Sequence, residues 1–384
     1  MDFAWPVEMQ RRLADARRFA EERLAATQRS TGFDSLAFRA AGEFGAFGLA
    51  LPKAWGGTGA GALATVAVLD AFGRGGADRG LLFAIGAHLF GCAMPIALHG
   101  TPRHAETYGE GLRTGAMVGA LAVTEAACGS SFDLMTTSAT ETPEGFVLNG
   151  EKTLISNASV ANVFLLMAKQ FPNQGSFGLT AFLVPNGLPG LTVTAITTAK
   201  GMPGSPVGHL RFENCLVPAD AMLGGPGAGL KVFMTSMQWE RTCILAGFIG
   251  AAERDLAACV MALQQRGDGR GALYRHQAVA HKLARVKLAI ESARLMLYRA
   301  AWAIDQGTAD LAMASMAKLA ASETVVAAAT DCMHLMAGTG WRGAAPVDTN
   351  GALDDALGTL FASGTSEVQL DILARQLQIE CRRK

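Results

Sequence analysis

The chain has 384 residues, of which 50% are hydrophobic and 17% are charged, and its formal net charge at pH 7 is +0. A chain of this length can bury a large core and form one fold of two or three units. The balanced charge gives no support to binding of nucleic acid or of an anionic surface. We find no uninterrupted apolar run of about 18 residues, which argues against a membrane span.

The cysteines and histidines do not indicate a metal site. Seven cysteines are scattered without C-x-x-C spacing, mostly inside apolar helical stretches, which is typical of reduced core residues in a cytosolic protein. The seven histidines form no H-x-x-x-H pair, and no Walker loop is present. The N-terminus, MDFAWPVEMQ, lacks a basic start followed by an apolar stretch. We therefore expect no export signal, a cytoplasmic location and no metal.

Helical patterns fill the N-terminal part of the chain. Apolar residues recur at helical spacing over 6–27 and 34–48, and the almost wholly apolar segments 63–75 and 81–99 predict buried helices. Between them, LALPKAWGGTGAG contains a proline and several glycines, which predict a loop. His88 lies on the second apolar segment. We expect a hydrogen-bonded core or pocket-lining histidine, with substrate contact as the alternative.

Strand patterns follow, from about residue 116 to 225. The stretch LAVTEAACGSSFDLMTTSATETPEGFVLNGEKTLISN, residues 121–157, contains alternating runs at 121–124 and 145–149, with turn signals at Pro-Glu-Gly and Asn149-Gly150. It predicts a small antiparallel sheet with hairpins. Two later segments, SFGLTAFLVPNGLPGLTVT and GHLRFENCLVPADAMLG, also alternate as strands do. A β region between two helical blocks predicts a ligand site where the three units meet.

The rest of the chain has helical patterns again. Segments 230–265, 272–307, 311–338 and 353–377 are long, amphipathic and joined by short links, which predicts a bundle. The first segment is expected as one helix or as two, because glycines interrupt its middle. Gly338-Thr339-Gly340 predicts a turn, which taken alone is weak evidence of function because helix ends use such turns constantly.

Together these segments resemble the acyl-CoA dehydrogenase flavoproteins. The stretch 121–157 is similar to the family's middle-domain pattern, A-x-T-E-P-x-A-G-S-D followed by N-G-x-K-x-W-I-T-N, and the P-x-x-x-G-G-x-G loop also matches. The resemblance implies an α+β fold with an N-terminal α-helical domain (1–115), a middle β-barrel or sheet domain (116–225) and a C-terminal four-helix bundle (226–384). It also implies FAD, an acyl thioester substrate and a homo-oligomer, either a dimer or a tetramer.

The resemblance further implies which residues bind FAD. Hydroxyl groups and backbone amides suit an isoalloxazine ring, because its heteroatoms need hydrogen bonds while its faces stay apolar. Without the resemblance, the same residues would be ordinary strand or turn residues. Arg266 and Gln277 match residues that contact the FAD of a neighbouring subunit, and an arginine fork suits a diphosphate. The expected FAD-binding residues are Leu121, Val123, Thr124, Gly129, Ser130, Leu154, Ser156, Arg266, Gln277, His334, Gly338 and Thr365.

Three positions near the expected flavin depart from the family pattern. The family's T-E-P is Thr124-Glu125-Ala126, the Asp after Gly-Ser is Ser131, and the Trp that covers one flavin face is Leu154. Leucine covers a ring without stacking on it as an indole does. We therefore expect the exchange with an electron-transferring flavoprotein, or the redox tuning, to differ from that of most relatives.

The catalytic base is expected at Glu240. In the family, a carboxylate takes the α-proton of an acyl thioester while the β-hydride passes to flavin N5, which requires a base of raised pKa in an apolar pocket. Most relatives carry this glutamate just before a late Gly-Thr, where this chain has Ser363. The isovaleryl and long-chain types carry it earlier, directly before an arginine, which matches Glu240-Arg241.

The helical pattern around Glu240 supports this assignment independently. Phe233, Met237, Ile244 and Phe248 form an apolar stripe at helical spacing, and Glu240 falls on it. A carboxylate on such a stripe is costly unless it is paired or used. The structural alternative is an intrahelical or inter-subunit ion pair, with Arg241 or with a neighbouring group.

The resemblance leaves the substrate open between two classes. We expect Ser130, Arg241, Ser363 and Gly364 to bind it. The leading hypothesis is an FAD-dependent α,β-dehydrogenation of an acyl-CoA or an acyl-carrier-protein thioester, with an electron-transferring flavoprotein as a further partner. The enzymatic alternative is a biosynthetic oxidation of a carrier-tethered hydroxy- or amino-acyl chain, or another flavin reaction such as cyclopropanation. A flavin-binding protein without dehydrogenase activity is the alternative outside the enzymes.

Overall fold

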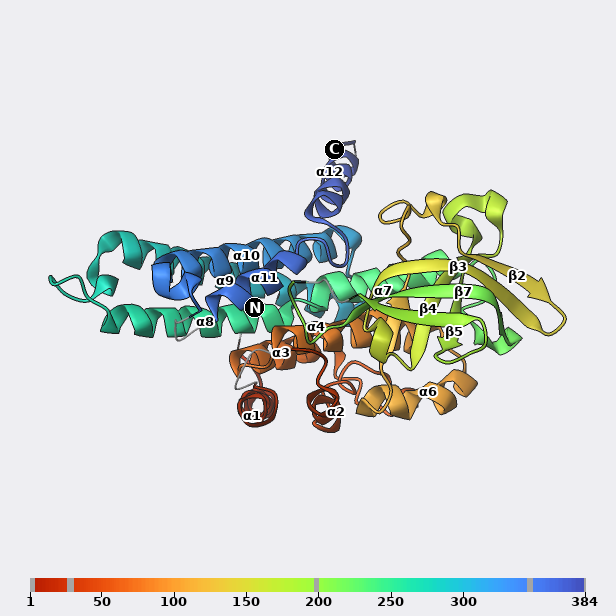
Figure 1. Cartoon of the computed structure of the whole chain (residues 1–384), viewed down its shortest axis with the longest axis horizontal. Helices are drawn as coiled ribbons and strands as arrows, with labels where there is room; N and C mark the ends of the chain where they lie inside the picture. The colour runs from red at the N-terminus through yellow and green to blue at the C-terminus, as the bar shows by residue number, and fades with distance from the viewer. Residues whose placement is uncertain (1–3, 26–30, 197–199, 344–347, 383–384) are drawn as a thin grey trace.

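Helices occupy both ends of the chain and strands occupy its middle, as a computed structural model describes for residues 4–25, 31–196, 200–343 and 348–382. The long C-terminal helices form one end of an elongated molecule and the β region forms the other (Figure 1). The N-terminal helices lie along one side of both. The predicted arrangement of helical, β and helical regions is confirmed.

The N-terminal region is helical, as expected. Its segments are α1 (Val7–Arg23), α2 (Ser35–Glu43), the short η1 (Lys53–Trp55), α3 (Gly61–Arg74), α4 (Arg79–Gly86), η2 (Ala87–Ala93), α5 (Met94–His99) and α6 (Pro102–Thr114). The buried helix expected over 81–99 corresponds to α4, η2 and α5, which follow one another without a break, and η2 is π-helical. Helix α6 is absent from the sequence prediction, although a capping box at Thr101 and a proline in the first turn mark its start.

His88 is a hydrogen-bonded core residue, which confirms the structural reading of this position. Its Nδ1 accepts a hydrogen bond from the Gly119 amide and its Nε2 donates to the Leu112 carbonyl, both at 2.9 Å. Burial lowers the pKa of His88 to about 4, although the hydrogen bond to Leu112 acts in the opposite direction. The imidazole is therefore neutral near pH 7 and joins η2 to the first strand.

The β region is one mixed sheet. Its strands are β1 (Gly119–Ala122), β2 (Ser138–Thr142), β3 (Gly145–Ser156), β4 (Val163–Lys169), β5 (Leu179–Pro185), β6 (Leu191–Ile196), β7 (Val207–Val217) and β8 (Met222–Leu223). The order is β6-β7-β3-β2-β4-β5-β8, and β1 lies parallel to β4. The expected hairpin at Pro-Glu-Gly is confirmed between β2 and β3.

Two details of the strand prediction are wrong. The first run ends at Ala122 and pairs in parallel, so Thr124 lies in the following loop. Asn149-Gly150 does not turn the chain, because both residues lie inside the long strand β3. There the pairing with β7 shifts register between Leu148 and Gly150, and Gly150 has a φ of 137°. The dipeptide therefore marks an irregularity in a strand.

Strand β4 alternates between two cores. Phe164 and Leu166 belong to a core inside the β region, whereas Leu165 and Met167 join the core of the helices. This alternation follows from the two-residue period of a strand. Because both faces of β4 are buried, the helices pack directly against the sheet.

The C-terminal region contains more helices than expected. They are α7 (Gly229–Cys243), α8 (Ala246–Gln265), α9 (Gln277–Asp305), α10 (Leu311–Trp341), α11 (Thr349–Gly358) and α12 (Ser366–Arg382). The segment 230–265 forms two helices, one of the two outcomes expected. The single helix expected over 353–377 is wrong, since a turn over 359–365 separates α11 from α12. Gly338-Thr339-Gly340 lies inside the end of α10, after a kink at Ala337.

Two helical stretches among the described residues are long and apolar enough to cross a membrane by length and composition alone. Arg79–His99 is 89% buried inside the molecule and Leu311–Trp341 is 44% buried. This is weak evidence for a membrane span, because the core helices of a globular chain meet the same criteria.

A buried ion pair joins the loop after β1 to strand β3. The fully buried Lys152 donates from Nζ to Glu125 Oε1 at 2.8 Å and to the Val123 carbonyl at 3.0 Å. Glu125 also accepts from the amides of Thr136 and Thr137, at 2.7 and 3.0 Å. Burial raises the pKa of Glu125, yet the Lys152 charge and these hydrogen bonds together lower it to about 2. The loop is therefore fixed against the sheet by a charged, fully hydrogen-bonded group.

Replacing Lys152 with methionine tests this connection. The variant leaves the Glu125 carboxylate buried without its cation, so we expect the free energy of unfolding at pH 7 to fall by about 3 kcal/mol or more. Urea unfolding measures the loss. Lys169→Met is the control, because it removes only a hydrogen bond to the Asp133 carbonyl and should cost about 1 kcal/mol or less. Equal losses in the two variants would contradict the account.

Candidate active site

Glu240 lies on the buried face of α7, between η2 and the turn over 359–365. Glu240 is only 7% exposed. Ser363 Oγ donates a hydrogen bond to Glu240 Oε2 at 2.8 Å. The opposite side is closed by Gly91 of η2, because a Cβ added at Gly91 would clash with Glu240 Oε1. The same added Cβ would lie 3.4 Å from Leu121 Cβ, so the end of β1 reaches this place as well. The carboxylate thus sits where the three regions of the chain meet.

The charge state of Glu240 is set mainly by burial. Burial raises the pKa of Glu240 to about 7, and the hydrogen bond from Ser363 and the charge of Arg241 only partly oppose this rise. Within the described part of the chain, Glu240 forms no ion pair. Of the structural alternative, the intrahelical ion pair with Arg241 is therefore not formed, since Arg241 Nε donates to the Ser363 carbonyl. A buried carboxyl group with a pKa near 7 can take and release a proton close to neutral pH.

Arg241 contacts the same turn from the other side of α7. It is 7% exposed, and its Nε donates to the Ser363 carbonyl at 3.1 Å. Gly364 has a φ of 96°, and a Cβ there would lie 2.8 Å from Gln369 Nε2. The predicted substrate-binding residues Arg241, Ser363 and Gly364 are thus brought together with Glu240. Ser130, the fourth, is exposed on the loop after β1.

The β region presents groups that fit the expected flavin. The hydroxyls of Thr124, Ser130 and Ser156 make no hydrogen bond to any described residue, so they are free to meet the edge of a heteroaromatic ring. Leu154 is 63% exposed, with a φ of 56°, and offers an apolar surface beside them. Val123 is buried, and Gly129 is exposed next to Ser130. Unpaired hydroxyls together with an exposed apolar side chain match the needs of an isoalloxazine ring.

The remaining expected cofactor residues form a second group, far from the first. Arg266 follows the end of α8, where its Nη1 donates to the Met336 carbonyl at 3.2 Å, and Gln277 begins α9. His334 and Gly338 lie close to Met336 on α10 and are exposed. Figure 1 shows this end of the helices opposite the β region. One chain therefore does not bring the two groups together. Thr365 lies in the turn over 359–365, two residues after Ser363.

Several residues at the site are absent from the sequence prediction. Gly91 makes room for the carboxylate, and the π-helical geometry of η2, which often marks functional positions, has no clear sequence signal. Lys318 is fully buried on α10 and donates from Nζ to the Leu360 carbonyl at 2.9 Å. A buried lysine and a glycine on apolar helices are visible in the sequence. Their partners become apparent only in three dimensions.

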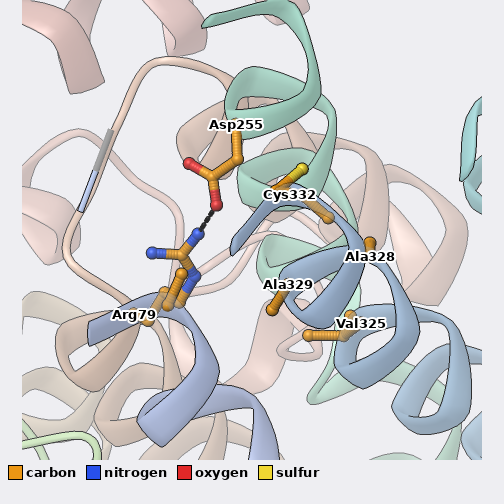
Figure 2. A pocket seen from close by; sticks show the side chains of 8 residues that line it. Arg79, Asp255, Val325, Ala328, Ala329 and Cys332 are labelled. Carbon is orange, nitrogen blue, oxygen red and sulfur yellow. Dashed lines mark hydrogen bonds and ion pairs between the residues drawn. The ribbon is translucent and has the colours of Figure 1, made fainter. Parts of the chain in front are cut away.

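Two hollows lie elsewhere in the molecule. The one in Figure 2 has a volume of ≈ 10 Å³ and lies between Arg79, Asp255 and α10, with Arg79 hydrogen-bonded to Asp255. It holds one water at most. A wider surface groove is lined by Trp55, Thr101 and other residues of η1 and α6. Neither hollow includes an expected site residue.

Comparison with known proteins places these features in a family. Family models described as acyl-CoA dehydrogenase N-terminal, middle and C-terminal domains match residues 8–116, 120–215 and 227–378. An L-prolyl-[peptidyl-carrier protein] dehydrogenase of Pseudomonas fluorescens is 35% identical, over 99% of this chain and 100% of that protein.

Two solved structures are similar to this chain over almost its whole length. One is the prolyl acyl carrier protein oxidase AnaB, with a TM-score of 0.93 and 32% identity over 97% of this chain and 100% of that chain. The other is PigA with FAD and proline, with a TM-score of 0.94 and 31% identity over 99% and 100% of the two chains. The family and fold predicted from the sequence are thus confirmed: the chain belongs to the acyl-CoA dehydrogenase family.

Proposed function

We propose that this chain is an FAD-dependent oxidoreductase that dehydrogenates an acyl thioester held by a carrier protein, with an amino-acyl group of the prolyl type as the substrate class. Two relatives that are similar over their whole length, both named for a prolyl group on a carrier protein, support a carrier-bound substrate. They favour dehydrogenation over cyclopropanation and over a non-catalytic role. The observation that carries the proposal is the buried carboxylate of Glu240, to which Ser363 Oγ donates a hydrogen bond.

Glu240 acts as the general base that removes the α-proton of the thioester. A carboxylate without a counter-ion in an apolar site is a stronger base than one in water, because burial raises its pKa. When bound, FAD supplies the hydride acceptor for the dehydrogenation. The apolar walls of α7 and η2 exclude water from the carboxylate, and Gly91 leaves the space that the carboxylate occupies.

Most of the other predicted site residues keep their roles in this proposal, whereas Arg241 and Ser363 change theirs. Leu121, Val123, Thr124, Gly129, Ser130, Leu154, Ser156 and Thr365 hold the flavin end of FAD, and Arg266, Gln277, His334 and Gly338 hold its diphosphate and adenylate end in a neighbouring subunit. Because one chain separates these two groups, a homo-oligomer completes the site. Ser130 and Gly364 bind the substrate, whereas Arg241 and Ser363 act on it through Glu240.

An electron-transferring flavoprotein or oxygen would accept the electrons that bound FAD takes from the substrate. We propose a cytoplasmic location, which the six buried free cysteines support. Residues 1–115, 116–225 and 226–384 form the three domains.

Glu240→Gln tests the assignment of the base. The variant keeps the shape of the side chain but cannot accept the proton. We expect a yellow protein whose flavin absorption no longer bleaches anaerobically with prolyl carrier-protein thioester, a loss of about 10²-fold or more in rate. Glu151→Gln, at an exposed glutamate of β3, is the matched control and should bleach at the normal rate. Full activity in Glu240→Gln would end the proposal.

The substrate class is tested by offering the same prolyl group on a carrier protein and on coenzyme A. We expect faster bleaching with the carrier-bound thioester, because a relative that is 35% identical over its whole length is named an L-prolyl-[peptidyl-carrier protein] dehydrogenase. Butyryl-CoA is the control for an ordinary fatty acyl substrate. Faster bleaching by butyryl-CoA would contradict the amino-acyl assignment and leave the dehydrogenase assignment intact.

The rate should also depend on pH in a defined direction. Only ionised Glu240 can accept a proton, and its pKa is raised to about 7. We therefore expect the rate of flavin bleaching to be low at pH 5 and to rise through a midpoint near pH 7. Stopped-flow measurement under anaerobic conditions gives this profile. A rate that is already maximal at pH 5 would show that no group with this pKa limits the reaction.

A further inference from the structure

The turn over 359–365 places Ser363 in an unusual backbone conformation. Ser363 has a φ of 56°, a left-handed conformation that residues with a side chain seldom adopt. Gly364 follows with a φ of 96°. A strained residue persists only where its surroundings fix it, and such residues gather at functional sites.

Three side chains fix this turn through its carbonyl groups. Arg241 Nε donates to the Ser363 carbonyl at 3.1 Å, and Lys318 Nζ donates to the Leu360 carbonyl at 2.9 Å. Gln369 Nε2 donates to the carbonyls of Ser363 and Gly364, at 3.3 and 3.1 Å. Both cations are buried, Lys318 completely. Burial of two cations is unfavourable by itself, so their hydrogen bonds to one turn indicate that its position matters.

The result is that the Ser363 hydroxyl meets Glu240 from a fixed direction. Its Oγ donates to Oε2 at 2.8 Å, while Oε1 lies against Gly91. The charge that acts on the carboxylate is that of Arg241 on α7. The described residues that lie at it from other elements, Gly91, Leu121 and Ser363, are uncharged. Lys318 donates to a carbonyl and Arg241 to another. Ser363 is therefore the donor that contacts the carboxylate directly.

We propose that Ser363 is a positioning residue for Glu240: its hydroxyl orients the carboxylate and stabilises its ionised form. This inference rests on the proposed role of Glu240. In this proposal Ser363 contacts the base, whereas the sequence predicts that it binds the substrate. A hydrogen bond to an ionised group is stronger than one to a neutral group, so its loss favours the protonated carboxyl.

Ser363→Gly and Ser363→Asn test the proposal as a pair. Glycine tolerates the left-handed backbone but lacks a donor, whereas asparagine tolerates it and carries an amide donor. We expect Ser363→Gly to move the midpoint of the kcat profile to higher pH by about one to two units. At pH 7 its kcat should fall by about ten-fold or more, with partial recovery at pH 9 and little change in KM. Ser363→Asn should move the midpoint back toward that of the unaltered enzyme.

The alternatives give different results. In Ser363→Gly, a raised KM with an unshifted midpoint would make Ser363 a substrate contact and overturn the proposal. An unchanged pH profile of kcat would also overturn it. If the glycine variant does not fold, Ser363→Ala supplies the same comparison without the hydroxyl. Glu240→Gln distinguishes a failure of the proposed function from a failure of the positioning role of Ser363. Retained activity there refutes the proposed function, whereas lost activity there with no shift in Ser363→Gly refutes only the positioning role.

Discussion

The structure depends on one uncommon interaction, a buried carboxylate that has a hydroxyl group rather than a cation as its partner. A carboxylate in an apolar site is unfavourable unless it is paired or neutralised. At Glu240 the partner is Ser363 Oγ, and burial raises the pKa of Glu240 to about 7. The pKa of Glu240 is therefore close to neutral pH, where the group can both gain and lose a proton. A general base that works near neutral pH needs this property.

Segments from all three regions of the chain surround this carboxylate. The N-terminal region supplies η2, where Gly91 leaves room for one oxygen. The C-terminal region supplies α7 and the turn before α12, held by buried Arg241 and Lys318. The β region brings Leu121, at the end of β1, to the same place, and the loop that follows is fixed to the sheet by the Glu125–Lys152 pair. Each contact is made between segments far apart in sequence, so the site forms only when the three regions pack together.

The sequence predicts the family and the helical, β and helical regions because motifs and periodicity are local signals. It also predicts that Glu240 lies on a buried helical face, as it does, since its apolar neighbours recur at helical spacing. The prediction of one helix over 353–377 fails, because the apolar spacing continues across the turn that contains Ser363. The prediction of a turn at Asn149-Gly150 fails, because a local turn signal is overridden by pairing with a distant strand. Gly91 and Lys318 escape prediction for the same reason: their partners lie on other elements.

The central claim is that Glu240 contacts the carbon from which the proton is removed. The most direct measurement is a structure of the enzyme with FAD and an unreactive prolyl thioester analogue. The account predicts a Glu240 carboxylate oxygen next to the α-carbon, at about 3 to 3.5 Å, with Ser363 Oγ on its other oxygen. An α-carbon beyond the reach of Glu240, with a different side chain beside it, would contradict the account.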